Sequence, residues 1–203
     1  MALNFANNNS LSAITSLPAS ISSGSMTLIQ EQTASSSSTI SFTSGIDSTY
    51  DEYVFKFINI HPQNDQAGFE FQGSTDGGSN YNVTITSSTF KAHHDEADSA
   101  TSLNYDGDDD QAQGTAFQNL SHKNQIGNDN DQHYSGILRI FNPSSSVFVK
   151  HFISQGVESH YADYIINTFF AGYFNTTSPI NAFQFKMHSG NIDAGVIKLY
   201  GVS

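Results

Sequence analysis

The residues best equipped for chemistry lie in a single stretch, AHHDEADSATSLNYDGDDDQ, which spans residues 92–111. It places two histidines and seven carboxylates within twenty positions. Carboxylates and imidazoles are the groups that bind metal ions and that serve as general acids and bases. The stretch therefore suggests three hypotheses: a metal site, a catalytic pair of acids and a solvated acidic loop.

A calcium site can be tested by its spacing, because the helix–loop–helix calcium loop requires Gly at position 6 and Glu at position 12. Counted from Asp106, these positions hold Gln111 and Phe117, and the second acidic run, NDNDQH, places Tyr134 where the glycine belongs. Neither run fits the motif. The oxygens of Asp106–Asp110 still leave an irregular calcium site open, beside the favoured interpretation of a solvated loop held by Asx-turns.

A zinc site is not expected. His93 and His94 are adjacent, so on a strand their side chains point to opposite faces and cannot share a metal ion. The chain has no cysteine and no HExxH motif. Cysteine-based zinc sites, disulfides and thiol catalysis are therefore excluded.

An enzyme is not expected either. A glycosidase needs two rigidly placed carboxyl groups, one of them desolvated. The predicted strands carry few acids, and Glu70 lies between Phe69 and Phe71 in GFEFQ, which places it on an outward, solvated side. The sequence contains no GxSxG elbow and no phosphate-binding loop. We therefore expect no catalytic and no cofactor-binding residues.

The composition favours short strands joined by turns. Charged residues make up 13% of the 203 positions, and Ser, Thr, Asn and Gly are abundant beside 16 Phe and 9 Tyr. The net charge of −12 disfavours nucleic acid and anionic membranes as partners. No secretory signal and no apolar run of membrane length is visible, so we expect the chain to fold in a cytoplasm.

The pattern along the chain predicts an N-terminal arm over residues 1–25 and a β-sandwich domain over 26–203. About ten short strands, separated by Asn, Gly, Pro and Ser turns, indicate an all-β, antiparallel sandwich of the jelly-roll kind. The clearest strand segments are 52–60, 68–72, 81–86, 135–142, 145–154, 165–175, 181–190 and 194–202.

The faces of these strands are informative. In NAFQFKMHSG, the residues Phe183, Phe185 and Met187 alternate with polar ones, which is typical of a half-buried strand. In 52–60 and 147–153, apolar residues occupy both faces. A second apolar face must be covered by the N-terminal arm, by a long loop or by another subunit.

Tyrosines in GSNYN, LNYDGD, DQHYSG and SHYADY suggest a further hypothesis. Their rings could stack on sugar rings while neighbouring Asn and Asp side chains form hydrogen bonds. The alternative is that these tyrosines cover the edge of the core with their hydroxyl groups in water.

Four segments, GIDSTYDEYVFKFINIHP, HHDEAD, FNPSSSVFVKHFIS and FKMHSGNIDAGVIKLYG, resemble small virion structural proteins of marine tailed bacteriophages, of the cyanophage type. The likeness runs from about residue 20 to the C-terminus. It implies a β-sandwich module exposed on a virion. It implies no catalytic or ligand residues.

The functional hypothesis that follows is a non-enzymatic virion structural protein. We expect an oligomeric decoration or cement protein on the head exterior, assembled in the host bacterial cytoplasm. Its expected partners are further copies of itself and other virion proteins, above all the major capsid protein. The alternatives are a tail-fibre or tail-tip protein that recognises host surface glycan, and a glycan-cleaving enzyme that uses the acidic stretch.

Overall fold

The computed structural model describes residues 26–202, and the arm expected over residues 1–25 lies outside them. Every regular element in the described part of the chain is a strand. The strands are β1 (Thr27–Ser37), β2 (Ile40–Phe42), β3 (Glu52–Pro62), β4 (Phe69–Ser74), β5 (Ile85–Asp95), β6 (Thr101–Tyr105), β7 (Ala112–Gly114), β8 (Gln118–Asn119), β9 (Tyr134–Phe141), β10 (Lys150–His160), β11 (Tyr164–Phe174), β12 (Ala182–Met187) and β13 (Ile192–Val202). Residues 26–202 contain no helix that is long and apolar enough to cross a membrane.

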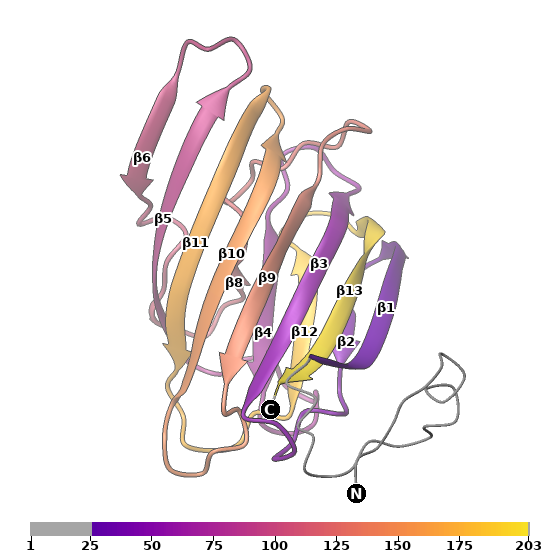
Figure 1. Cartoon of the computed structure of the whole chain (residues 1–203), viewed down its shortest axis with the longest axis vertical. Helices are drawn as coiled ribbons and strands as arrows, with labels where there is room; N and C mark the ends of the chain where they lie inside the picture. The colour runs from indigo at the N-terminus through magenta and orange to yellow at the C-terminus, as the bar shows by residue number, and fades with distance from the viewer. Residues whose placement is uncertain (1–25, 203) are drawn as a thin grey trace, which may run out of the picture.

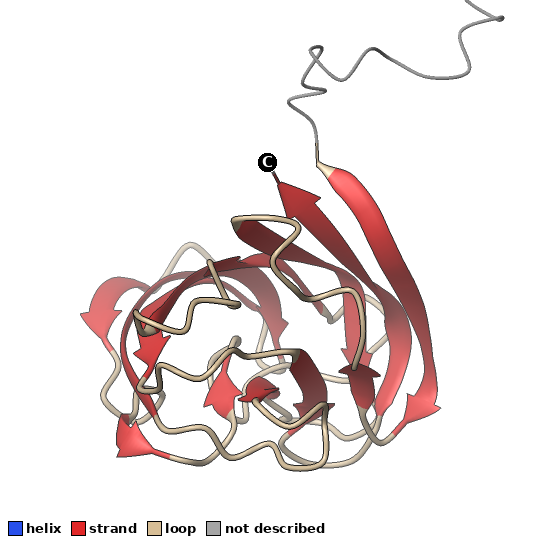
Figure 2. Cartoon of the chain, turned by 90° about the horizontal axis from the view of Figure 1, so that it is seen from below, coloured by secondary structure: helices blue, strands red, loops and turns tan. Residues whose placement is uncertain are grey.

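The strands form two antiparallel sheets. The larger sheet has the order β1-β13-β3-β9-β10-β11-β5-β6, with β7 beside β5, and the smaller has the order β2-β12-β4-β8. Figure 1 shows the larger sheet in front of the smaller one, and Figure 2 shows the strands surrounding a shared interior. The expected antiparallel β-sandwich is confirmed.

Eight of the strands are divided equally between the two sheets, and along the chain they change sheet at every step except from β4 to β8. The row β1-β13-β3-β9 belongs to the larger sheet, and the row β2-β12-β4-β8 forms the smaller one. Two insertions widen the larger sheet: β5 to β7 lie between β4 and β8 in sequence, and β10 and β11 follow β9. They place β10, β11, β5 and β6 side by side beyond β9. We call these four strands the sheet extension (Figure 1).

Aromatic side chains fill the interior between the sheets. Phe183, Phe185 and Met187 are buried, so the predicted alternation of this segment is confirmed. The ring of Phe185 lies at the centre of the core, with its centroid 4.9 Å from that of Phe55. It also packs against the rings of Phe42, Phe57, Phe69 and Phe71.

The prediction of two apolar faces in residues 52–60 is only partly right. Tyr53, Phe55 and Phe57 face the core as expected, but Ile60 is also fully buried. A bulge causes this, because Asn59 has a φ of 50° and the pairing with β9 shifts between Phe57 and Ile60. The outer side of β3 therefore presents fewer apolar residues than alternation alone predicts.

Other expected strands have different limits. The segment 81–86 becomes a strand only at Ile85, and 145–154 only at Lys150. Consequently Val147 and Phe148 lie exposed in the loop before β10 rather than on a sheet. Strands β6, β7 and β8 were not predicted, because β7 and β8 have only three and two residues and β6 contains a single apolar–polar–apolar triplet, Leu103–Tyr105.

Candidate functional site

The two histidines of the acidic stretch contact different partners. Nδ1 of His93 lies 2.9 Å from the hydroxyl of Ser102 on β6, and the ring of His93 packs edge-on against Tyr164. Nε2 of His94 lies 3.3 Å from Asp98 in the β5–β6 turn, at an exposed position. The prediction that these neighbours do not act as one pair agrees with this arrangement.

The first acids of the stretch build the turn between β5 and β6. The carboxylate of Asp95 accepts hydrogen bonds from the amides of Ser99 and Ala100, at 2.8 and 2.9 Å, and from the Ser99 hydroxyl. These bonds stabilise the charged carboxylate and lower the pKa of Asp95 to about 2. Its side chain is therefore an ionised structural group.

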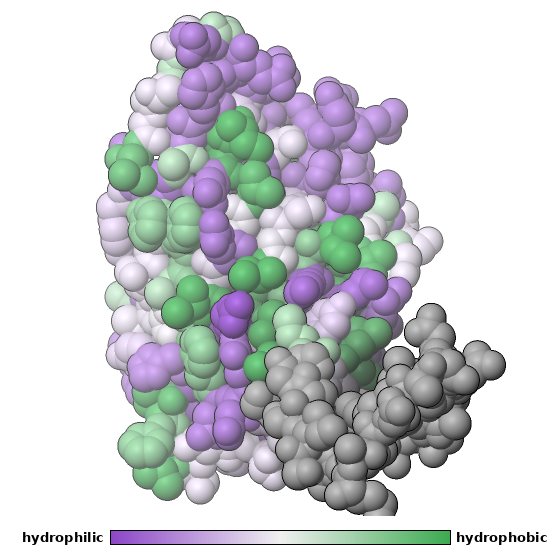
Figure 3. Space-filling model, viewed as in Figure 1, coloured by the Kyte–Doolittle hydropathy of each residue, from purple (hydrophilic) through white to green (hydrophobic). Residues whose placement is uncertain are grey.

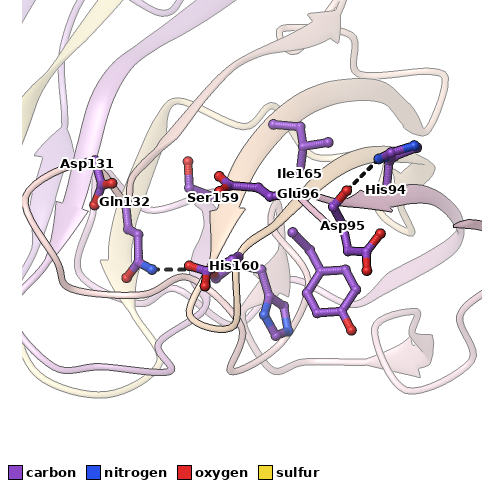
Figure 4. Close-up of a pocket in the computed structure, with 10 residues that line it drawn as sticks. His94, Asp95, Glu96, Asp131, Gln132, Ser159, His160 and Ile165 are labelled. Atoms are coloured by element: carbon purple, nitrogen blue, oxygen red, sulfur yellow. Dashed lines mark hydrogen bonds between the residues drawn. The ribbon is translucent and has the colours of Figure 1, made fainter. Parts of the chain in front are cut away.

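Asp95 also lines a small pocket at the end of the sheet extension, drawn in Figure 4. The pocket has a volume of about 210 Å³ and further acidic walls at Glu96, Asp131 and Asp163. Dashed lines in Figure 4 mark two hydrogen bonds among the lining residues: one joins the ring of His94 to the carbonyl of Asp95, and the other joins the side chain of Gln132 to the carbonyl of His160. Among the groups labelled there, Asp95 and Gln132 form hydrogen bonds with backbone groups of the neighbouring turns.

The last acids of the stretch contradict the expectation of a solvated loop. Asp109 is only 3% exposed, and Asp106 is half-buried. The chain from Asp106 to His133 crosses the inner side of the sheet extension, where the hydroxyl of Thr168 donates to the carbonyl of Leu120. Asp108 remains exposed, as predicted.

Asp106 and Asp109 meet His122 and Lys91 in this crossing. Oδ2 of Asp106 lies 2.6 Å from Nζ of Lys91 and 2.9 Å from Nε2 of His122. Oδ1 of Asp109 accepts hydrogen bonds from Nδ2 of Asn119 and from the amide of Lys123. Burial, together with the charge of Asp106, raises the pKa of Asp109 to about 7.

Glu158 of β10 completes this group, and sequence reasoning missed it. Its side chain is 1% exposed, and Oε2 accepts a hydrogen bond of 2.9 Å from the amide of His122. Burial, and then the charge of Asp109, raises the pKa of Glu158 well above its ordinary value. We call Lys91, Asp106, Asp109, His122 and Glu158 the buried acid cluster. A signal was present, because Glu158 follows Ser154 and Gly156 on the inward side of its strand.

Glu70 also departs from expectation. It is 6% exposed rather than solvated. The register places Lys186 directly opposite Glu70 on β12, and Nδ1 of His188 lies 3.1 Å from its Oε1. Glu70 is therefore part of a cross-strand charge pairing and not a free acid.

The outer side of the sheet extension is apolar. Side chains that alternate with the buried ones point outward from its four strands, and several are large and exposed. They are Phe90, Leu103, Tyr105, Ile153, Val157 and Ile165, with exposed fractions between 41% and 71%. We call this surface the outer apolar face. Figure 3 shows apolar side chains over these strands, with polar residues between them.

A sheet with one solvated side usually carries its charged residues on that side, but the sheet extension carries them on its inner side. In the sheet extension, Lys91, Asp95, Lys150 and Glu158 occupy inward positions. The outward positions of these four strands hold no Asp, Glu, Lys or Arg. A groove of about 490 Å³ crosses this face, lined by groups that include His151, Ile153, Ala171 and Tyr173.

Comparison of the chain with protein-family models, with curated proteins and with solved structures gives no match. Function must therefore be inferred from the described residues themselves. The resemblance to marine phage virion proteins stays a prediction.

Proposed function

We propose that the chain is a non-enzymatic virion structural protein, an oligomeric decoration protein that binds the head exterior of a tailed bacteriophage through its outer apolar face. The observation that carries this proposal is an uncharged apolar surface on a strongly acidic chain. Exposed patches of this kind are typical of protein–protein contacts. Assembly on the virion would take place in the host bacterial cytoplasm.

The charge distribution supports association through this face. With a net charge of −12, two copies repel each other over most approaches. The strand positions of the outer apolar face carry no carboxylate, and the carboxylate of Asp110 lies only at its edge, where it accepts a hydrogen bond from Tyr105. On the other part of the same side, from β9 to β1, charges are paired, with Arg139 2.7 Å from Glu52 and Lys198 3.0 Å from Glu31. Contact here adds little repulsion, whether the partner is another copy or the capsid.

The size of the surface is adequate for a specific interface. β5, β10 and β11 have eleven residues each. Strands of that length extend about 36 Å, and three of them side by side span about 14 Å. Together with the five-residue β6, they cover about 600 Å², which approaches the roughly 800 Å² that each partner contributes to an interface of standard size.

The fold supports the same class of function. We infer that the rows β1-β13-β3-β9 and β2-β12-β4-β8 form an eight-stranded jelly roll, to which the sheet extension is added. Jelly rolls occur in viral capsid proteins and in lectins. This support is an analogy of fold, and the outer apolar face supplies the argument from residues.

The decisive experiment locates the protein on intact particles by electron microscopy. Many copies on the head are expected, and a few copies confined to the tail would overturn the decoration role. A variant with Ile153→Lys and Ile165→Lys should fold but fail to rebind particles that lack the protein. Leu28→Lys is the matched control, because Leu28 is 50% exposed, as is Ile153, but lies on β1 at the far edge of the sheet.

A second candidate, recognition of host glycan by a tail component, is favoured by one pocket. The ring of Tyr161 stacks on His160 with centroids 4.3 Å apart, beside a pocket of about 430 Å³ that Tyr164, His93 and Asn104 also line. Aromatic and hydrogen-bonding groups converge there, as sugar binding requires. Saturable binding to host surface polysaccharide that Tyr161→Ala abolishes would favour this candidate over decoration.

A further inference from the structure

Three metal-binding side chains converge in the buried acid cluster. One donor atom each from Asp106, Asp109 and His122 can be chosen so that all three lie within 4.8 Å of one another. Asp106 follows β6 directly, and His122 lies in the segment that reaches across to β10. The site thus joins parts of the chain that the fold alone brings together.

Neighbouring groups hold two of these ligands in position. Nδ1 of His122 lies 3.2 Å from the carbonyl of Lys123, so a proton on Nδ1 leaves the Nε2 lone pair free. Oδ1 of Asp109 is occupied by Asn119 and the Lys123 amide. Its Oδ2 is 3.6 Å from Nδ1 of His122, which is longer than a hydrogen bond, whereas Nε2 of His122 faces Asp106 at 2.9 Å. Supporting contacts of this kind orient ligands in metal sites.

Glu158 provides an independent observation. Its carboxylate is 1% exposed and is fixed against the cluster through the amide of His122. Its second oxygen, Oε1, is buried without a hydrogen-bond partner. A buried carboxylate oxygen is unfavourable unless a proton or a cation compensates it.

With its carboxyl groups ionised, the buried acid cluster has two more negative than positive charges. Asp106, Asp109 and Glu158 contribute three negative charges when ionised, and Lys91 contributes one positive charge. Lys123 also faces Asp109, but its side chain is exposed and therefore screened. Two protons or one divalent cation would make the site neutral.

We propose that Asp106, Asp109 and His122 bind one divalent transition-metal ion of the Zn²⁺ or Mn²⁺ class, with Glu158 balancing its charge from behind. A mixture of nitrogen and oxygen ligands favours these ions over Ca²⁺ and Mg²⁺, which prefer oxygen alone. The sequence left an irregular calcium site open at Asp106–Asp110 as the alternative to a solvated loop. The site proposed here differs from it, because Asp108 takes no part and His122 is a ligand. This site is independent of the proposed virion role.

Binding would fix the crossing segment to the sheet extension. Lys91 is the competitor for this role, because its ammonium group already pairs with Asp106 at 2.6 Å. A metal ion must share Asp106 with Lys91 or displace it. Removing the ammonium group should therefore strengthen metal binding.

The test uses the full chain, treated with chelator and dialysed, in calorimetric titrations and thermal melts with Zn²⁺, Mn²⁺ and Ca²⁺. Binding of one Zn²⁺ or Mn²⁺ per chain with a raised melting temperature is expected. Asp109→Asn should weaken it at least about tenfold. Asp108→Asn is the matched control, because it removes an acid from the same turn but outside the site, and it should bind like the wild type.

Two further variants keep the result unambiguous. Lys91→Met should bind Zn²⁺ more tightly than the wild type and should melt lower in chelator. If Asp109→Asn fails to fold, His122→Gln provides the same test at a second ligand. Equal Zn²⁺ affinity in the wild type and in whichever ligand variant folds would overturn the proposal, as would a wild type whose melting temperature no ion changes. Location on the virion is unaffected by either outcome.

Discussion

The ring of Phe90 on β5 lies flat against the ring of Phe169 on β11, with centroids 4.7 Å apart and planes 10° from parallel. The two residues are direct partners in the sheet register, and Tyr105 of β6 is the next partner of Phe90. Phe90 remains 47% exposed. The stack is therefore a rigid aromatic platform on the outer apolar face, already ordered before any partner arrives.

The first prediction concerns this platform. Phe90→Ser should weaken self-association or capsid binding, while lowering the free energy of unfolding by no more than about 1.5 kcal/mol. The stability cost is small because the ring is half in water already. Sedimentation velocity measures the association and urea unfolding the stability. Unchanged association in a folded variant would exclude this part of the face from the interface.

A second prediction concerns the centre of the core. Phe185→Ala should lower the free energy of unfolding by about 3–5 kcal/mol, because it removes a ring that packs against five others and leaves a cavity. Phe148→Ala is the matched control. Its ring is 69% exposed, so its loss should change stability by less than about 0.5 kcal/mol. Similar losses from both variants would contradict the position of the core.

A third prediction concerns pH. The pKa of Asp95 falls from 3.8 to about 2 on folding, so the folded state holds this carboxylate ionised where the unfolded state begins to bind a proton. Its contribution to stability is complete above pH 3.8 and is lost as pH falls towards 2. Melting temperatures of wild type and Asp95→Asn should therefore converge over that range. A constant difference between them would show that ionisation of Asp95 is not the cause.

The alternation of apolar and polar residues predicted those strands whose two faces meet different surroundings without interruption. The alternation around Phe185 identified a half-buried strand because one face of that strand meets only the core. Ile60 was misplaced because a bulge at Asn59 changes the alternation by one residue. Asn adopts positive φ more readily than most residues, but the sequence alone does not say where a strand uses that freedom.

The buried acid cluster escaped prediction for a different reason. The amide of His122 donates to Glu158 across 36 residues of sequence, and no spacing motif covers such a distance. Acidic residues in a run normally stay in water. Asp109 is buried because the crossing segment covers the inner side of the sheet extension, where Asn119 and the amide of Lys123 donate hydrogen bonds to its carboxylate. The outer apolar face was foreseen in part, through Ile153, since a second apolar face on a strand is visible in the sequence.

The last prediction concerns the close approach of β9 and β10. Gly156 faces Gly136 directly across the sheet, and the buried ring of Tyr134 lies over Gly156. A methyl group at position 156 would overlap the ring of Tyr134. Gly156→Ala should therefore lower the free energy of unfolding by about 1–3 kcal/mol, measured in urea.

Two further variants distinguish this overlap from a general effect of alanine. Gly107→Ala is the control, because its new methyl group would meet only a Tyr105 ring carbon at an ordinary 3.8 Å. Tyr134→Leu is itself destabilising, but it removes the overlapping ring. In the Tyr134→Leu protein, Gly156→Ala should lower the free energy of unfolding less than it does in the wild type, and the difference should be about 0.5–3 kcal/mol. If the two losses simply add, the glycine is required by something other than Tyr134, and the packing explanation for this strand pair is wrong.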